Sequence, residues 1–156
     1  MQLSVIAIGK NSSDSLKKLE RLYLKRISYY LNLELVEVDN VKKTDNLKKS
    51  DVIKSEADKL IKRIPKNSYK ICLSEEGKHF TSEIFAKYLK KLLLYKNEPV
   101  YFIIGGPFGL GKKVKSNSHK ILSLSHFTFP HQLSRIILLE QIYRAMTIIK
   151  GKNYHY

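Results

Sequence analysis

The sequence of 156 residues contains one cysteine, no tryptophan and no long apolar run. Because Cys72 has no second cysteine to pair with, an intramolecular disulfide and a cysteine metal cluster are both excluded. No apolar stretch approaches the length of a membrane span, and the one at residues 1–9 is too short for a signal peptide. These absences predict a soluble, unprocessed protein of the cytoplasm.

Acidic residues are also scarce in this chain. Asp and Glu number 14 against 29 Lys and Arg, which gives a formal net charge of +15. Such an excess attracts polyanions and favours a nucleic-acid partner, although charge does not say which nucleic acid. A lysine-rich proteome would produce the same bias, because Asn, Ile and Tyr are abundant here as well.

The chain length suits one domain, residues 1–156, with a core of its own. Strand-like and helix-like segments alternate, which is typical of an α/β fold with a mainly parallel sheet and helices on both faces. Strands are predicted at residues 3–8, 33–38, 69–73, 100–104 and 121–124. Helices are predicted at residues 14–30, 52–64, 81–93, 112–118 and 132–149, with N-caps at Asp14 for the first and at Thr81 or Ser82 for the third. A basic loop or frayed helix start is predicted at residues 40–50, and a turn at residues 75–78.

The last predicted helix, residues 132–149, is apolar on nearly every side. Within a domain of this size only one side of it can lie on the sheet, so burial of the remainder predicts a homodimer. Its polar exceptions Glu140 and Arg144 stand four positions apart, with the acid first, and predict a partly buried ion pair. Such a pair can order a functional site or serve the fold alone.

A glycine turn follows the fourth predicted strand. Residues 106–112 match the first seven positions of the nucleotide-binding pattern G-x-x-x-x-G-K-[ST], but Lys113 breaks the match. The strand at residues 121–124 also ends without the acid that helps to hold Mg²⁺ in those enzymes, so nucleotide hydrolysis is not predicted. Gly105 and Gly106 remain at the carboxyl edge of a strand, where a ligand could approach the backbone and use its N–H groups. An ordinary turn would use the same glycines.

Five histidines are spread along the chain. No two of them have metal-ligand spacing together with a third acid or thiol, so no metal site is predicted. His79 and His119 are predicted to be ordinary surface or core residues. His131 and His155 have aromatic and apolar neighbours that would place them at a pocket rim, where titration near neutral pH is useful for acid–base chemistry.

An ordered set of residues in the chain resembles one known family. The set comprises Leu73, Gly105-Gly106-Pro107-x-Gly109, Leu124-Ser125-x-x-Thr128-Phe129-Pro130-His131-Gln132, Arg135, Glu140-Gln141-x-Tyr143-Arg144-Ala145 and Tyr154-His155. It resembles the small SPOUT-superfamily methyltransferases of the ribosomal RNA large subunit methyltransferase H family, which modify a pseudouridine of 23S ribosomal RNA. The resemblance covers the whole chain, and the block at residues 129–145 and the C-terminal tail are its specific parts.

This resemblance implies an α/β fold with a C-terminal trefoil knot, a homodimer, and S-adenosylmethionine bound in the knot near the subunit interface. It implies cofactor contacts from Leu73, Gly105, Gly106, Leu124, Ser125, His126, Phe127, Thr128 and Phe129. A composite active site is implied as well, in which the C-terminal tail and Arg144 act across the dimer. Phe108 departs from the family pattern, because relatives generally carry a polar residue such as Glu or Asn there.

The reaction that the resemblance implies is methylation of ring nitrogen three of the pseudouridine, with ribosomal RNA in the assembled ribosome as the implied substrate. The imide nitrogen must lose its proton before it becomes a good nucleophile, so a base or a positive charge is needed. His155 and His131 are the candidate bases. Arg144 would stabilise the negative charge, and Tyr154 would position the nucleobase or stack on it. The alternative function is a non-enzymatic basic RNA-binding protein, which would bind RNA without a cofactor.

Overall fold

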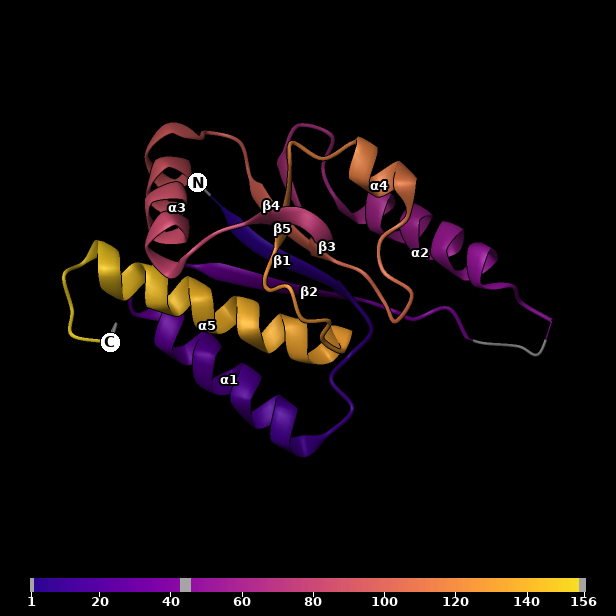
Figure 1. Cartoon of the computed structure of the whole chain (residues 1–156), viewed down its shortest axis with the longest axis horizontal. Helices are drawn as coiled ribbons and strands as arrows, with labels where there is room; N and C mark the ends of the chain where they lie inside the picture. Colours follow the sequence, from indigo (N-terminus) through magenta and orange to yellow (C-terminus); the bar gives the residue numbers. More distant parts are fainter. Residues whose placement is uncertain (1, 43–45, 155–156) are drawn as a thin grey trace.

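The computed structural model describes residues 2–42 and 46–154 as a five-stranded sheet between two layers of helices (Figure 1). Its strands are β1 (Leu3–Ile8), β2 (Leu33–Val38), β3 (Tyr69–His79), β4 (Val100–Ile104) and β5 (Lys120–Ser123). Its helices are α1 (Asp14–Ser28), α2 (Lys49–Arg63), α3 (Ser82–Tyr95), α4 (Lys112–Ser116) and α5 (His131–Ile149). The alternation predicted from apolar periodicity is confirmed.

The sheet has the strand order β2-β1-β4-β3-β5, and every neighbouring pair is parallel. The predicted parallel sheet is therefore confirmed. Parallel pairing brings the carboxyl ends of all five strands to one edge of the sheet, where ligands bind in open α/β folds. β4 lies in the interior of the sheet, and its five residues are all buried, as expected for a strand covered on both faces.

Helices cover both faces of the sheet, as predicted. Figure 1 shows α1, α3 and α5 together on one side and α2 and α4 on the other. Alternate residues of β4 point to opposite faces. Phe102 packs with Leu89 and Leu138 in one apolar core, whereas Ile103 packs with Leu60 and Val114 in the other.

β3 differs from its prediction, because it continues to His79 through the segment predicted as a turn. Both Leu73 and Lys78 lie opposite Leu122 of β5, so the residues between them bulge out of the ladder. Gly77 makes this bulge possible, since a Cβ atom there would lie 2.4 Å from the backbone carbonyl carbon of Leu122. The residues predicted to form a turn therefore form a bulge in the pairing of β3 with the edge strand β5.

Helix boundaries differ from the predictions by a few residues. Ser13, rather than Asp14, caps α1, and its hydroxyl accepts the Leu16 N–H at 3.1 Å. Thr81 is the cap of α3, where its hydroxyl accepts the Ile84 N–H at 3.2 Å. Residues 43–45 of the predicted basic loop lie outside the described residues, and α2 begins before the predicted end of that loop, at Lys49.

The flanks of α5 are covered within the chain more than the sequence suggested. On one side Tyr143 contacts Tyr23 of α1, with ring centroids 6.4 Å apart. On the other side Gln141 accepts a hydrogen bond from the Ser82 hydroxyl of α3 at 2.8 Å. Part of the apolar surface that was assigned to a second subunit therefore packs between α1 and α3. Among the described residues, none of the helices is long and apolar enough to cross a membrane.

Candidate functional site

A cleft of about 810 Å³ opens at the carboxyl edge of β3, β4 and β5. Its walls come from the β3 bulge, from the loop between β4 and α4, and from the loop between β5 and α5. A volume of this size suits a small organic ligand. The sheet edge predicted to bind a ligand is therefore hollowed in the structure.

Eight of the nine residues predicted to contact the cofactor line this cleft. They are Leu73, Gly105, Gly106, Leu124, Ser125, Phe127, Thr128 and Phe129. His126 does not line the cleft, and its ring stacks on His79 at a centroid distance of 3.7 Å. His79 is exposed, as predicted for an ordinary surface residue, and this stacking contact joins the end of β3 to the loop between β5 and α5.

The glycine turn after β4 closes on itself. The Gly109 N–H donates to the Gly106 carbonyl at 3.0 Å, and Gly109 has a φ of +81°, which favours glycine. A Cβ atom on Gly105 would lie 2.7 Å from the Gly109 carbonyl oxygen. A side chain at position 105 would therefore collide with the backbone of the same turn, so this position requires glycine.

Glu56 of α2 contacts this turn and does not line the cleft. Its buried carboxyl group accepts the Gly106 N–H, and a Cβ atom on Gly106 would lie 2.7 Å from Glu56 Oε2. The Gly106 N–H, which the sequence analysis considered as a donor to a ligand, is thus already bonded to Glu56. A sequence signal for Glu56 does exist, because it stands four positions from both Val52 and Leu60 on the apolar face of α2.

His131 is the first residue of α5 and lines the cleft together with Ser134. Burial, assisted by the positive charge of Arg135, lowers the pKa of His131 below its ordinary value. The ring is therefore neutral at neutral pH and can accept a hydrogen bond or a proton. The predicted position of His131 at a pocket rim agrees with this geometry.

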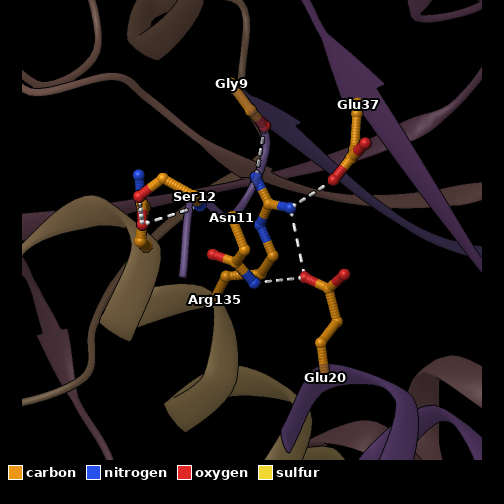
Figure 2. Close-up of polar contacts among 7 residues, drawn as sticks. Gly9, Asn11, Ser12, Glu20, Glu37 and Arg135 are labelled. Carbon is orange, nitrogen blue, oxygen red and sulfur yellow. Dashed lines mark hydrogen bonds and ion pairs between the residues drawn. The ribbon is translucent and has the colours of Figure 1, made fainter. Parts of the chain in front are cut away.

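Arg135 follows one turn later on α5 and is fully buried (Figure 2). One terminal guanidinium nitrogen binds Glu20 Oε2 at 3.1 Å and Glu37 Oε1 at 2.8 Å. The other donates to the Gly9 carbonyl oxygen. One cation therefore joins the start of α5 to α1, β2 and the loop after β1. Burial raises the pKa of Glu20, although the positive charge of Arg135 acts to lower it.

Two smaller contacts extend this network, as Figure 2 shows. The Asn11 side chain donates to Glu20 Oε2 at 2.7 Å, and the Ser12 hydroxyl lies 3.1 Å from Gln132 Oε1. The sequence placed Arg135 and Gln132 in the family motif without a role. Arg135 lies on the buried face of α5, three and four positions before Leu138 and Leu139, and this spacing is the signal that could have identified it.

The predicted catalytic residues Arg144 and Tyr154 form a cluster near the C-terminal end of α5. Arg144 pairs with Glu140 at 2.7 Å, which confirms the predicted ion pair, and its guanidinium lies 4.9 Å from the Tyr154 ring centroid. The hydrogen bond that Arg144 donates to the Glu140 carboxylate raises the pKa of Arg144 and keeps it cationic. Burial raises the pKa of Tyr154, so its phenol stays neutral.

The structure does not bring this cluster to the cleft of the same chain. Arg144 lies roughly 20 Å along α5 from His131, at the usual rise per residue, and neither Arg144 nor Tyr154 lines the cleft. His155, the other candidate base, lies outside the described residues. The predicted site is therefore divided between the two ends of one helix.

The lining of the cleft includes two lysines. The Lys49 ammonium lies 5.4 Å from the ring centroid of Phe108. Lys115 pairs with Glu76 at 2.9 Å. Both lysines line the cleft together with Glu75 and Glu76, so side chains of both charges surround it. In the described part of the chain, no group of three or more His, Cys, Asp or Glu side chains is arranged to hold a metal.

Comparison with known proteins gives full-length matches. A family model described as a predicted SPOUT methyltransferase matches residues 1–155. The chain is 42% identical to the ribosomal RNA large subunit methyltransferase H of Halothermothrix orenii, 40% to that of Carboxydothermus hydrogenoformans, and 39% to that of Bacillus thuringiensis. In each case the match covers 99% of both chains.

Solved structures of similar fold are more distant in sequence. A probable methylase family protein from Haemophilus influenzae has a TM-score of 0.55 and 12% identity, over 99% of this chain and 70% of that one. A probable rRNA-methyltransferase from Porphyromonas gingivalis has a TM-score of 0.54 and 12% identity, over 95% of this chain and 69% of that one. At this identity the likeness concerns the fold alone.

Proposed function

This chain belongs to the SPOUT methyltransferases, and from that premise we propose that it methylates ring nitrogen three of a pseudouridine in 23S ribosomal RNA. The methyl donor in this proposal is S-adenosylmethionine. The observation that carries the proposal is the cleft of about 810 Å³, which is lined by eight of the nine residues expected to contact the donor. Membership in a methyltransferase family also favours an enzyme over a non-enzymatic RNA-binding protein.

The residues of the cleft fit this donor. Leu73 and Leu124 offer apolar contacts, and the backbone of the glycine turn at positions 105 and 106 lines the same cleft. When bound, S-adenosylmethionine supplies an electrophilic methyl group on a sulfonium. We assign the trefoil knot of the family to the segment that includes the loop after β4 and the loop after β5, because both of these loops line the cleft.

The chemistry assigned to the chain is removal of the imide proton and stabilisation of the anion that results. Neutral His131 can accept a hydrogen bond or the proton at the cleft, and His155 remains the second candidate base. Arg144 is held cationic and would stabilise the negative charge of the imide. The neutral phenol of Tyr154 would position or stack on the nucleobase.

We assign Arg144 and Tyr154 to the cleft of a second copy of this chain. The support is the distance of their cluster from the cleft along α5, because one chain places these groups too far apart to act on one nucleobase. A homodimer would bring the C-terminal end of one α5 to the cleft of the partner. Ribosomal RNA as substrate agrees with the net charge of +15 and with Lys49 in the lining of the cleft.

The proposal is tested by transfer of a labelled methyl group from S-adenosylmethionine to ribosomes that lack the modification. Two substrates are compared, one carrying the pseudouridine and one in which the target uridine was never isomerised. We expect label only in the hairpin that carries the pseudouridine. Binding of S-adenosylmethionine without transfer to this hairpin would retain the donor site and refute the assigned substrate.

A further inference from the structure

We propose that Glu56 is a positioning residue of the methyl-donor site, which holds the Gly105–Gly106 turn in the shape that forms one wall of the cleft. This inference rests on the proposed function, because it concerns the cleft that would bind S-adenosylmethionine. Glu56 does not line the cleft itself. It acts through the backbone of Gly106, which does line the cleft.

The carboxyl group of Glu56 contacts Gly106 in two ways. It accepts the Gly106 N–H, and it fills the space that a side chain at position 106 would need, since a Cβ atom there would lie 2.7 Å from Oε2 and 2.8 Å from Oε1. The glycine at position 106 is therefore required by Glu56. One contact fixes the peptide plane and the other fixes its distance from α2.

The turn is held from within as well. The Gly109 N–H donates to the Gly106 carbonyl at 3.0 Å, so both the N–H and the carbonyl of Gly106 have partners in the protein. The N–H belongs to the peptide group before the Gly106 Cα and the carbonyl to the peptide group after it, so one contact restrains each of the two peptide planes. Loss of the Glu56 contact would leave the turn fastened on one side only, and the wall of the cleft would become variable.

A carboxylate at this buried position needs an explanation beyond packing. Glu56 is 3% exposed, and within the described residues its Oε2 atom has no hydrogen-bond partner. Burial raises the pKa of Glu56 above the ordinary value, although the Gly106 N–H and Lys59 oppose this effect. A leucine would fill a similar volume without the cost of burying a charge, but it could not accept the Gly106 N–H.

The first experiment measures binding of S-adenosylmethionine to the purified full-length protein by calorimetry. In Glu56→Leu the volume is kept and the acceptor is lost, so we expect the Kd to rise about tenfold. In Glu56→Gln an acceptor oxygen remains, and we expect a Kd within about threefold of the unmodified protein. Asp58→Ala is the matched control, because Asp58 lies on the same helix but pairs with Lys113 on the surface, and it should leave the Kd unchanged.

A kinetic measurement separates positioning from a general loss of structure. With saturating S-adenosylmethionine, Glu56→Leu should keep its kcat on ribosomes within about twofold while KM for the donor rises. An equal fall in kcat for Glu56→Leu and Glu56→Gln, or unfolding of both variants, would assign Glu56 to the fold as a whole and overturn the inference.

The second experiment uses the space that Glu56 occupies. Gly106→Ala places a methyl group against the carboxylate and should weaken binding of S-adenosylmethionine, whereas the pair Glu56→Ala with Gly106→Ala removes that collision. We expect the double variant to bind the donor more tightly than Gly106→Ala alone. Binding by the double variant that is no tighter would contradict the proposed contact.

The Gly106 amide gives a readout that does not depend on the donor. Its nuclear magnetic resonance signal should shift in Glu56→Leu and stay close to its original position in Glu56→Gln. If the unmodified protein does not bind S-adenosylmethionine, the proposed function fails, and this signal still reports on the hydrogen bond. If the protein binds the donor and Glu56→Leu binds it equally well, only the role of Glu56 is refuted.

Discussion

At the scale of single residues, the buried cation Arg135 connects α5 to α1, to β2 and to the loop after β1. Its side chain is 1% exposed and contacts two carboxylates and the Gly9 carbonyl, so its charge is compensated where water is absent. A buried ion pair of this kind is weak evidence for stability, but removal of one partner leaves an uncompensated charge. The position of α5, and of His131 at its start, depends on that balance.

Replacement of Arg135 tests this balance. We expect Arg135→Met to lower the free energy of unfolding by about 3–5 kcal/mol, because Glu20 and Glu37 would lose their buried partner. Urea denaturation gives this value directly. Lys96→Met is the control, since its pair with Glu98 is partly exposed and should matter by less than about 1 kcal/mol. A loss no larger than that of the control would contradict the assigned role.

The single thiol offers a second prediction at this scale. Cys72 is fully buried in β3, and burial raises its pKa to about 11. The reactive thiolate is therefore rare at neutral or mildly alkaline pH in the folded protein. We expect alkylation at pH 8 to be slow in the native protein and rapid in guanidinium chloride. Fast modification without denaturant would mean that the β3–β5 edge opens readily.

At the scale of elements, the β3 bulge is the feature that shapes one wall of the cleft. The same segment pairs with β5 on both sides of the bulge, so the edge of the sheet is kept while Ser74–Glu76 turn toward the cleft. Bulges of this kind commonly redirect side chains near functional sites. Gly77 is essential to it because it lies against the backbone of Leu122.

Gly77→Ala should separate β3 from β5 locally. The added Cβ atom would meet backbone atoms that have no room to yield, so we expect a loss of about 1–3 kcal/mol in the free energy of unfolding. Weaker binding of S-adenosylmethionine should accompany this loss. Gly111→Ala serves as the comparison, because its Cβ atom would lie 3.1 Å from a flexible Ile53 side-chain atom and should change stability by less than about 1 kcal/mol. Equal thermal stability of the two variants would contradict the prediction.

At the scale of the whole molecule, the proposed site is incomplete in one chain. The cleft lies at the start of α5 and the Arg144 cluster lies near its end. Two inactive variants should therefore complement each other. Gly106→Val disrupts the cleft through its collision with Glu56, whereas Arg144→Ala removes the distant charge.

After subunit exchange, a mixture of these two variants should regain up to about a quarter of the original methyl-transfer activity, because half of the dimers carry one intact composite site. Activity is measured on ribosomes, and light scattering reports the oligomeric state. A mixture as inactive as either variant alone, with exchange demonstrated, would place both groups in the site of one chain.

The basic surface also belongs to the whole molecule. With a net charge of +15, RNA affinity should fall steeply as salt rises. Lys49→Gln should reduce the slope of log affinity against log salt by about 0.7, the value expected for one phosphate contact in a single strand. Lys90→Gln on the exposed face of α3 removes the same charge away from the cleft and should leave the slope nearly unchanged. Equal slopes for the two variants would exclude a local phosphate contact at Lys49.

The predictions made from sequence were most accurate where one periodicity governed a segment. Buried strands such as Leu3–Ile8 and Val100–Ile104 were predicted with their bounds, because continuous apolar runs bounded by turns allow little else. The segment after Leu73 was predicted as a turn, and its strand pairing was missed. Glycine and charged residues suit both structures, and only the approach of β5 selects the bulge.

By itself, the sequence determined the parallel α/β fold through local patterns and the family through residue types at fixed spacing, and the resemblance to that family implied eight of the residues that line the cleft. Only the tertiary structure decided that Glu56 uses the Gly106 amide, that Arg135 is matched by Glu20 and Glu37, and that Arg144 stands far from the cleft. These contacts join residues distant in sequence, and a buried charge reveals its partners only when the elements that carry them are packed together.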